Sequence, residues 1–170
     1  VNANNTAVGF ECGKVVTTGL QNTLIGGLAG HALTDADFNI AIGYTALNTD
    51  TLGSRSTAIG YAALLGQNFS SATNSNNTAV GHIAGASVTT GINNTFVGAE
   101  AGDALTDADY NVAVGFSALT ANQLGGYNTA LGAQALGNCN PASATLMYNT
   151  AVGLNACLLY TSDAADDTTG

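Results

Sequence analysis

Two pairs of aspartates are the clearest candidates for chemistry in this sequence. Asp35 and Asp37 are separated by one residue, and the same pattern returns 72 residues later as Asp107 and Asp109. Carboxylates at this spacing on a turn could bind a hard cation such as Ca²⁺, and in a trimer whose axis they faced, threefold symmetry would multiply the ligands. No glycine-rich calcium signature surrounds either pair, so we favour solvated turns and assign no metal site, with these four residues as weak candidates.

The other reactive side chains do not indicate catalysis. His31 and His82 occupy different positions within the repeat described below, and neither lies near a serine or cysteine in the context of a nucleophile elbow. The three cysteines give neither a disulfide framework nor a metal-binding spacing. We therefore predict no catalytic residue, no bound cofactor and no enzymatic activity.

The composition argues against two classes of partner. Charged residues make up 8% of the chain, Lys14 and Arg55 are the only cations, and the net charge is -9. The chain therefore cannot form a basic surface for nucleic acid. Apolar residues make up 46%, but no uninterrupted run approaches the roughly 20 residues of a membrane-spanning helix, so we expect no membrane insertion of this segment.

A short motif organises the sequence. It reads Asn, a Thr or other β-branched residue, usually Ala, then Ile, Val or Leu, then Gly, and after two variable positions a small residue followed by Gly or Leu. Successive central glycines are separated by 17 residues, except for two gaps of 21. Three gaps of 17 and one of 21 equal the 72-residue offset of the aspartate pairs, which indicates duplication of a four-coil block. The glycines are Gly9, Gly26, Gly43, Gly60, Gly81, Gly98, Gly115, Gly132 and Gly153.

This period predicts an all-β fold. Seventeen residues hold two short strands and two bends, but they are too few for an αβ repeat, and a helical turn would fit only at residues 33–37. We predict a parallel β-solenoid of nine coils over residues 1–156, with strands stacked in register about 4.8 Å apart. The motif asparagines would stack as an amide ladder and favour the turn before each strand. They are Asn22, Asn39, Asn77, Asn94, Asn111 and Asn128, with Ser56 in the fourth copy.

Alternation within each strand separates two faces. The second and fourth motif positions, such as Thr6 and Val8, are mostly β-branched and share one face, whereas the alanine between them lies on the other. We assign the β-branched face to the interior, together with the small residues after the bend, such as Ala29. The alanine face would then be outside and suited to lateral association. On this assignment Val97→Asp places a charge in the interior and breaks the stack.

Two further features could carry recognition. The long gaps, residues 65–76 and 137–148, would extrude loops on one side of the rod, as binding loops or as neutral spacers. Aromatic residues after central glycines would project from the bend, toward a glycan or, as we favour, into a subunit interface. These aromatic residues are Phe10, Tyr44, Tyr61 and Phe116.

The motif resembles known repeat arrays. Residues 4–9 and 76–81 are similar to the head repeat of YadA-type trimeric autotransporter adhesins, and the 17-residue form resembles the repeats of phage tail-fibre proteins and their bacterial relatives. This resemblance covers residues 1–156. It implies a left-handed parallel β-roll that is trimeric and presents a binding surface. The adhesin head has a shorter spacing than the 17 and 21 residues found here.

These patterns lead to an expected function. A thin coil buries little apolar volume, so a single rod should be marginally stable, and trimerisation about the fibre axis would cover it. We expect a structural and adhesive module of a phage tail fibre or related surface protein, on a virion or cell surface, that contacts a host glycan or protein. The alternatives are the head of a bacterial trimeric adhesin and an ice-binding solenoid. The assignment of the threonine column to the core argues against ice binding.

The two ends of the sequence need separate treatment. Residues 157–170 resemble translated sequencing adapter, and we exclude them from the fold; a genuine acidic tail is the alternative. The chain begins at Val1 without a methionine, so we expect it to be a fragment of a longer reading frame.

Overall fold

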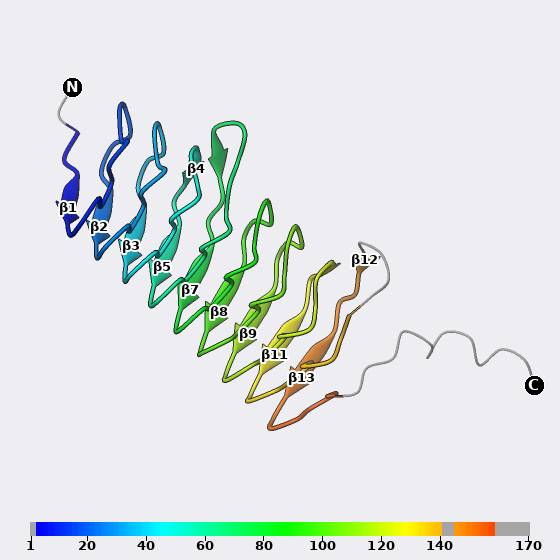
Figure 1. The fold of residues 1–170 in the computed structure, drawn as a ribbon. Coiled ribbons are helices and arrows are strands. Elements are labelled where there is room, and N and C mark those ends of the chain that lie inside the picture. The colour runs from blue at the N-terminus through cyan, green and yellow to red at the C-terminus, as the bar shows by residue number, and fades with distance from the viewer. Residues whose placement is uncertain (1–2, 141–144, 159–170) are drawn as a thin grey trace, which may run out of the picture.

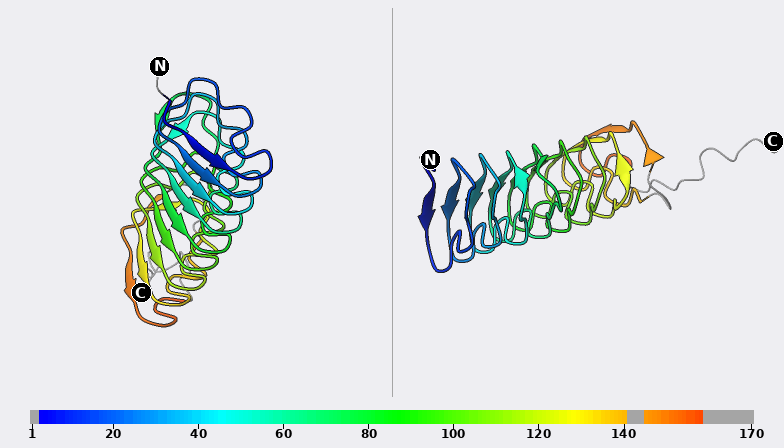
Figure 2. Two further views of the ribbon diagram at one scale, coloured as in Figure 1. Left: turned by 90° about the vertical axis from the view of Figure 1, so that its left-hand side faces the viewer. Right: turned by 90° about the horizontal axis from the view of Figure 1, so that it is seen from above.

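The computed structural model describes residues 3–140 and 145–158, and within these ranges it is all-β, with no helix. The chain winds as a parallel β-solenoid whose coils stack into a rod (Figure 1). The described part of the chain starts at one end of the rod and finishes at the other (Figure 2). Because it contains no helix, no described segment forms an apolar helix long enough to cross a membrane. Of the segment predicted to be foreign, only Cys157 and Leu158 lie within the described residues.

One nine-stranded parallel sheet runs along the rod. Each strand pairs with its equivalents in the adjacent coils at the same motif position, as in Thr6 with Thr23 and Ala113 with Ala130, which confirms stacking in register. The strands are β1 (Thr6–Val8), β2 (Thr23–Ile25), β3 (Ile40–Ile42), β5 (Thr57–Ile59), β7 (Thr78–Val80), β8 (Thr95–Val97), β9 (Val112–Val114), β11 (Thr129–Leu131) and β13 (Thr150–Val152).

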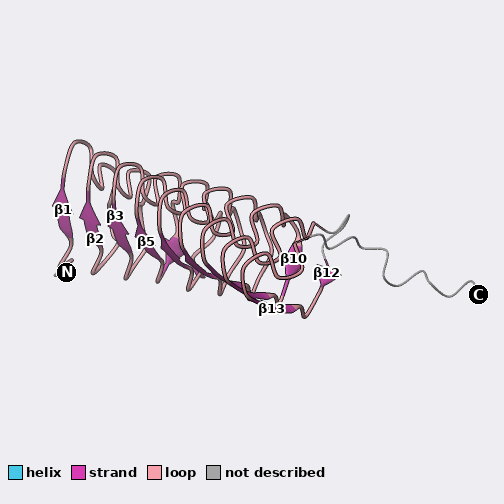
Figure 3. Ribbon diagram, turned by 90° about the horizontal axis from the view of Figure 1, so that it is seen from below, coloured by secondary structure: helices cyan, strands magenta, loops and turns pink. Residues whose placement is uncertain are grey.

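Two small sheets mark the long gaps in the repeat. Strand β4 (Gly53–Ser54) pairs with β6 (Thr73–Asn74), and β10 (Gly125–Gly126) pairs with β12 (Thr145–Leu146). Figure 3 places β10 and β12 near one end of the rod, beside the last coils of the main sheet. The helical turn considered for residues 33–37 is not formed, because these residues are in bends and irregular backbone.

The central glycines stack in a line along the rod. A Cβ atom on Gly43 would lie 2.3 Å from the carbonyl oxygen of Gly60, and Gly43 has a φ of 135°. A side chain at this position would therefore collide with the backbone of the next coil and strain its own backbone. The predicted alignment of the motif glycines is confirmed.

The interior of the solenoid is opposite to the predicted one. Ala41 and Ala58, at the third motif position, are fully buried, whereas Ile40 and Val97, on the β-branched face, are each 38% exposed. Ala46, after the bend, is also fully buried and belongs to the same core cluster. The inward alanines leave room in the interior for large side chains such as Leu47 and Leu64, which are fully buried, while the β-branched residues turn outward.

Large and small core residues compensate for one another between coils. Phe96 replaces the usual inward alanine, and a Cβ atom on Gly85 or Gly102 would lie 2.7 Å or 2.4 Å from its ring. Leu24 is matched in the same way by Gly30. In four coils the inward residue is alanine and a buried leucine stands at the position that Gly30 and Gly102 occupy in theirs, namely Leu47, Leu64, Leu119 and Leu136. Leu47 has a φ of 50°. Burying its side chain stabilises the fold by about 1.5–3 kcal/mol, which offsets a cost of about 1–2 kcal/mol for its left-handed backbone conformation.

The motif asparagines form the predicted ladder, mainly through the backbone. Asn22 Oδ1 accepts a hydrogen bond from the backbone N–H of Asn39 at 2.9 Å, and Asn39 Nδ2 donates to the carbonyl of Gly53 at 2.9 Å. Direct amide-to-amide bonds also occur, as from Asn128 Nδ2 to Asn111 Oδ1 at 3.0 Å. Each buried amide thus links its own coil to the next one.

Candidate functional site

The most extensive surface feature is the side of the main sheet that points away from the core, which we call the outer face. It has one column mainly of threonine and one of valine, isoleucine or leucine, and both run the length of the sheet. The threonine column is Thr6, Thr23, Ile40, Thr57, Thr78, Thr95, Val112, Thr129 and Thr150. The aliphatic column is Val8, Ile25, Ile42, Ile59, Val80, Val97, Val114, Leu131 and Val152.

The outer face corrects two sequence-based predictions. Val97 is 38% exposed, so Val97→Asp places its charge on the surface, not in the interior. Thr23 and Thr95 are half-buried on the same outer surface, so the threonine column is not part of the core. The predicted lateral association surface made of alanine is also wrong, because the alanines line the interior and the β-branched residues lie outside.

A ladder of side chains flanks the outer face where each strand begins. These residues directly precede the motif asparagine, or Ser56 in the fourth copy, and all have a positive φ. Tyr127 stacks on Tyr110 with ring centroids 4.8 Å apart, and Tyr148 packs on Tyr127 at 5.2 Å. We call this the start-corner ladder; its members are Asn4, Gln21, Phe38, Arg55, Asn76, Asn93, Tyr110, Tyr127 and Tyr148. The sequence reading missed it, although its residues recur with the motif spacing.

A second aromatic column lies where the strands end. Tyr44 stacks on Tyr61 with ring centroids 6.0 Å apart, and Tyr61 stacks on His82 at 5.2 Å. Phe10 and Phe116 occupy the same motif position, and all five residues are exposed. The aromatic residues thus project from the bend as predicted, and stacking along the rod holds Tyr44, Tyr61 and His82 in one row.

The four candidate aspartates connect neighbouring coils or turns. Asp37 Oδ1 and Asp109 Oδ1 accept the backbone N–H groups of Leu20 and Ile92, each at 2.7 Å. Asp35 accepts the hydroxyl of Thr18, and Asp107 accepts that of Thr106 at 2.6 Å. Within residues 3–140 and 145–158, no three or more His, Cys, Asp or Glu side chains are grouped to hold a metal ion.

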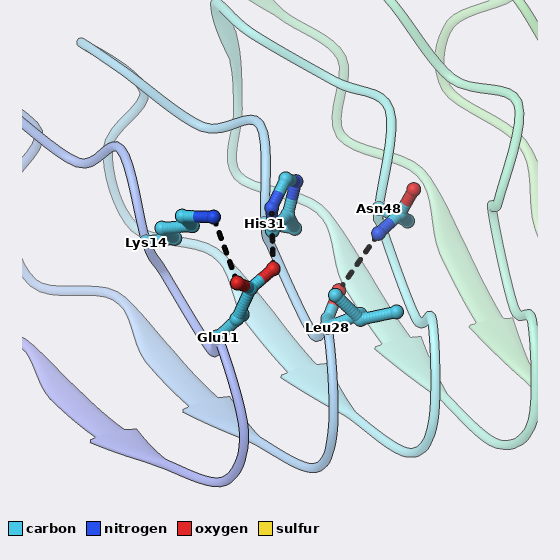
Figure 4. Close-up of polar contacts among 5 residues, drawn as sticks. All are labelled: Glu11, Lys14, Leu28, His31 and Asn48. Carbon is cyan, nitrogen blue, oxygen red and sulfur yellow. Dashed lines mark hydrogen bonds and ion pairs between the residues drawn. The ribbon is translucent and has the colours of Figure 1, made fainter.

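The two histidines have different surroundings. His31 Nε2 lies 3.4 Å from Glu11 Oε2, and Lys14 Nζ donates to Glu11 Oε1 at 2.7 Å (Figure 4). The hydrogen bond from Lys14 holds the pKa of Glu11 below its ordinary value, and the charges of Lys14 and His31 lower it further, against partial desolvation. His82 stacks on Tyr61 instead. The structure therefore does not bring the two histidines into one arrangement.

The described thiols are free and differ in exposure. Cys12 is half-buried, Cys139 is buried and Cys157 is exposed. Burial raises the pKa of the Cys139 thiol to about 11, with a further contribution from Cys157. The Cys139 thiol is therefore protonated at neutral pH and is a poor nucleophile.

Comparisons with known proteins do not identify the chain. No protein-family model matches it, and neither a curated protein nor a solved structure does. The resemblance to adhesin heads and tail-fibre repeats therefore stays a prediction. Function has to be inferred from the outer face and the ladders and loops around it.

Proposed function

We propose that this chain is a structural and adhesive rod that forms a homotrimer through its outer face and presents its corners and long loops to a host cell. Such a rod would be a module of a phage tail fibre or related surface protein, on a virion or cell surface. The head of a bacterial trimeric adhesin would use the same assembly and differs in its location. The outer face is the observation that carries the proposal.

The chemistry of the outer face favours association with copies of the same chain. Its aliphatic column is continuous over nine strands, and Val8, Leu131 and Val152 are 59%, 46% and 65% exposed. Soluble monomers rarely expose a contiguous apolar strip of this kind. β-Branched side chains are stiff at χ1, so they lose little conformational freedom when a partner covers them. A closed symmetric trimer would cover the strip on every copy.

Sedimentation equilibrium of the full chain and two variants tests this assembly. We expect three protomers of 16.8 kDa per particle for the wild type, and monomers with unchanged circular dichroism for Val97→Asp. Ser87→Asp adds the same charge at an exposed position outside the main sheet and should remain trimeric. A monomeric wild type, or a trimeric Val97→Asp variant, would contradict the proposal.

Ice binding is the second candidate, because the threonine column lies on the outer face. Thr57, Thr78 and Thr95 pair in register on adjacent strands, which repeats a hydroxyl and a methyl group about every 4.8 Å. The same face cannot contact ice while it is buried in a trimer. Thermal hysteresis from a monomeric wild type, lost in Thr78→Asp, would favour ice binding over the trimeric rod.

A further inference from the structure

A pocket of about 190 Å³ lies at the second long gap, where the strand pair β10 and β12 meets the preceding coil. It combines the second aspartate pair, one base of the long loop and the start-corner ladder, which the sequence presents as three separate features. Its walls include Asp107, Asp109, Leu124, Gly126, Tyr127 and Leu146. The volume is below the roughly 300–1,000 Å³ of sites for drug-sized ligands, so it suits a single small ring.

The first four-coil block shows what the pocket lacks. Seventy-two residues earlier, Ser54 stands in place of Gly126, and its Oγ accepts the backbone N–H of Asp37 at 2.9 Å. A Cβ atom added at Gly126 would lie 3.0 Å from the carbonyl oxygen of Asp109 and 3.7 Å from its amide nitrogen. Glycine therefore leaves open, beside the amide of Asp109, the space that a serine hydroxyl fills in the first block.

We propose that this pocket binds one uncharged sugar residue, with a sugar hydroxyl in the place that the Ser54 hydroxyl takes in the first block. That hydroxyl accepts the Asp109 N–H and donates to a carboxylate of the aspartate pair, while Leu124 and Leu146 pack on the C–H face of the ring. The assignment rests on the proposed adhesive function and names the chemistry of one of its contacts.

The charges around the pocket select the class of sugar. Asp107 and Asp109 line it and no cation does, so sialic acids, sulfated sugars and phosphate are repelled. At the equivalent corner of the first block, Arg55 replaces Tyr127 and Asn74 replaces Leu146. The first block thus has a cation and an amide where the second has an aromatic ring and an apolar wall.

Tyr127 contributes its edge and hydroxyl, not a free ring face. Tyr110 and Tyr148 pack on it at 4.8 Å and 5.2 Å, which fixes the ring without help from a ligand. Partial desolvation, together with the nearby Tyr110, Tyr148 and Asp109, raises the pKa of Tyr127. Its hydroxyl therefore stays protonated at neutral pH and can donate a hydrogen bond to a sugar oxygen.

NMR titration of the full chain with glucose, galactose, mannose and N-acetylglucosamine tests the assignment. We expect at least one of them to bind with a dissociation constant of roughly 1 mM and to shift the amide signals of Asp109 and Gly126. Gly126→Ser should weaken that binding at least tenfold, and the fold should be retained because serine occupies the equivalent Ser54 position. n-Butylamine and acetate serve as probes for simple attraction of a cation or an anion.

A graft in the opposite direction provides the matched control. Replacing Ser54, Arg55 and Asn74 by Gly, Tyr and Leu should create a second site and raise the stoichiometry from one to two sugars per chain. The assignment is overturned if no sugar binds, if binding survives Gly126→Ser, or if only n-butylamine shifts these signals. Sedimentation separates the two proposals, because a trimer that binds no sugar contradicts only the pocket, and a monomer that binds sugar contradicts only the trimer.

Discussion

The two four-coil blocks, residues 5–76 and 77–148, share one backbone plan but differ inside their last coils. Both keep the motif glycines in line and the motif strands in register. At three equivalent interior positions, however, the first block has Asp50, Gln67 and Ser75, and the second has Asn122, Cys139 and Met147. The backbone arrangement of each coil is thus repeated between the blocks, whereas the side chains in its interior are not.

In the first block these positions form a buried hydrogen-bond network. Asp50 Oδ1 accepts the backbone N–H groups of Gly53 and Phe69 at 3.0 Å and 3.3 Å, and Asp50 Oδ2 accepts Gln67 Nε2 at 2.6 Å. Gln67 Oε1 in turn accepts Asn77 Nδ2 at 2.8 Å. The carboxylate is fully buried, and three donors compensate for its lost hydration.

This network also repairs the asparagine ladder where Ser56 interrupts it. Ser56 Oγ lies 2.6 Å from Ser75 Oγ and accepts Gln67 Nε2 at 2.9 Å. A serine is too short to span the coil as asparagine does, so Gln67 completes the connection from Ser56 to Asn77. The departure from the motif at Ser56 and the polar interior therefore belong together.

In the second block the asparagine ladder is uninterrupted, and two of the three interior positions hold sulfur-containing side chains. Asn128 takes the motif position, and among the described residues the Asn122 side chain bonds the backbone N–H and carbonyl of Gly125, at 2.7 Å and 3.0 Å. Cys139 Sγ lies 3.8 Å from Met147 Sδ. The comparison shows that the asparagine ladder and the motif glycines determine the backbone conformation of the coil. The interior side chains can differ between blocks, provided that their polar groups are hydrogen-bonded.

The largest expected effect comes from breaking the size compensation in the core. Phe96→Ala should lower the free energy of unfolding by about 4 kcal/mol, because Gly85 and Gly102 cannot fill the cavity, and the equivalent Leu24→Ala should cost about 3 kcal/mol. Urea denaturation measures both. Adding Gly102→Leu to Phe96→Ala recreates the pairing of Ala41 with Leu47 and should recover part of the loss; no recovery would refute the compensation.

Removing the buried carboxylate should have the next largest effect. Asp50→Leu leaves the N–H groups of Gly53 and Phe69 and one of the two side-chain N–H groups of Gln67 without an acceptor, for a loss of about 3 kcal/mol. The equivalent Asn122→Leu breaks the two hydrogen bonds that its side chain makes with Gly125 and should cost about 1–2 kcal/mol. Equal losses in urea denaturation would mean that the two interiors do not differ in polar dependence.

The buried Cys139 thiol in the second block should react slowly with alkylating reagents while the protein is folded. With its pKa raised to about 11, Cys139 is ionised in roughly one molecule in a thousand at pH 8. Iodoacetamide should therefore label the exposed Cys157 well before Cys139, as read by peptide mass spectrometry. Labelling at equal rates in native protein would show that the second interior opens readily.

The smallest effect is expected at the surface cluster around Glu11. The second block has Ile83, Ala86 and Asp103 in place of Glu11, Lys14 and His31. Because the pKa of Glu11 is lowered by folding, its stabilising contribution is present above the ordinary carboxyl pKa and is lost as the pH falls through the lowered value. In an NMR titration, Lys14→Met should raise the Glu11 pKa toward its ordinary value, and an unchanged pKa would exclude the Lys14 contact.

The period alone was sufficient to predict how the coils stack. Identical residues at a fixed spacing, such as Gly26 and Gly43, must align if strands pair in register, and the asparagine ladder follows from the same repeat. The sheet faces were predicted wrongly because alternation separates two faces without saying which is inside. The space that the buried large side chains need decides that question, and the pairing of Leu24 with Gly30 was the sequence signal for it.

The surface was harder to predict than the stack. Tyr44 and Tyr61, which follow the central glycine, were predicted to project from the bend. The stacking of Tyr110 and Tyr127, which precede the motif asparagine, was not predicted. The pocket was missed because its walls come from segments up to 39 positions apart, between Asp107 and Leu146. Only the fold brings the aspartate pair, the ladder and the loop base together.

The 72-residue offset has a consequence for how such a chain can evolve. Unequal recombination between the two blocks would insert or remove four whole coils at once, a change of about 19 Å in reach. Every column would continue across the junction without a fault. Selection could thus adjust the length of the rod in discrete steps, independently of the residues that vary within each block.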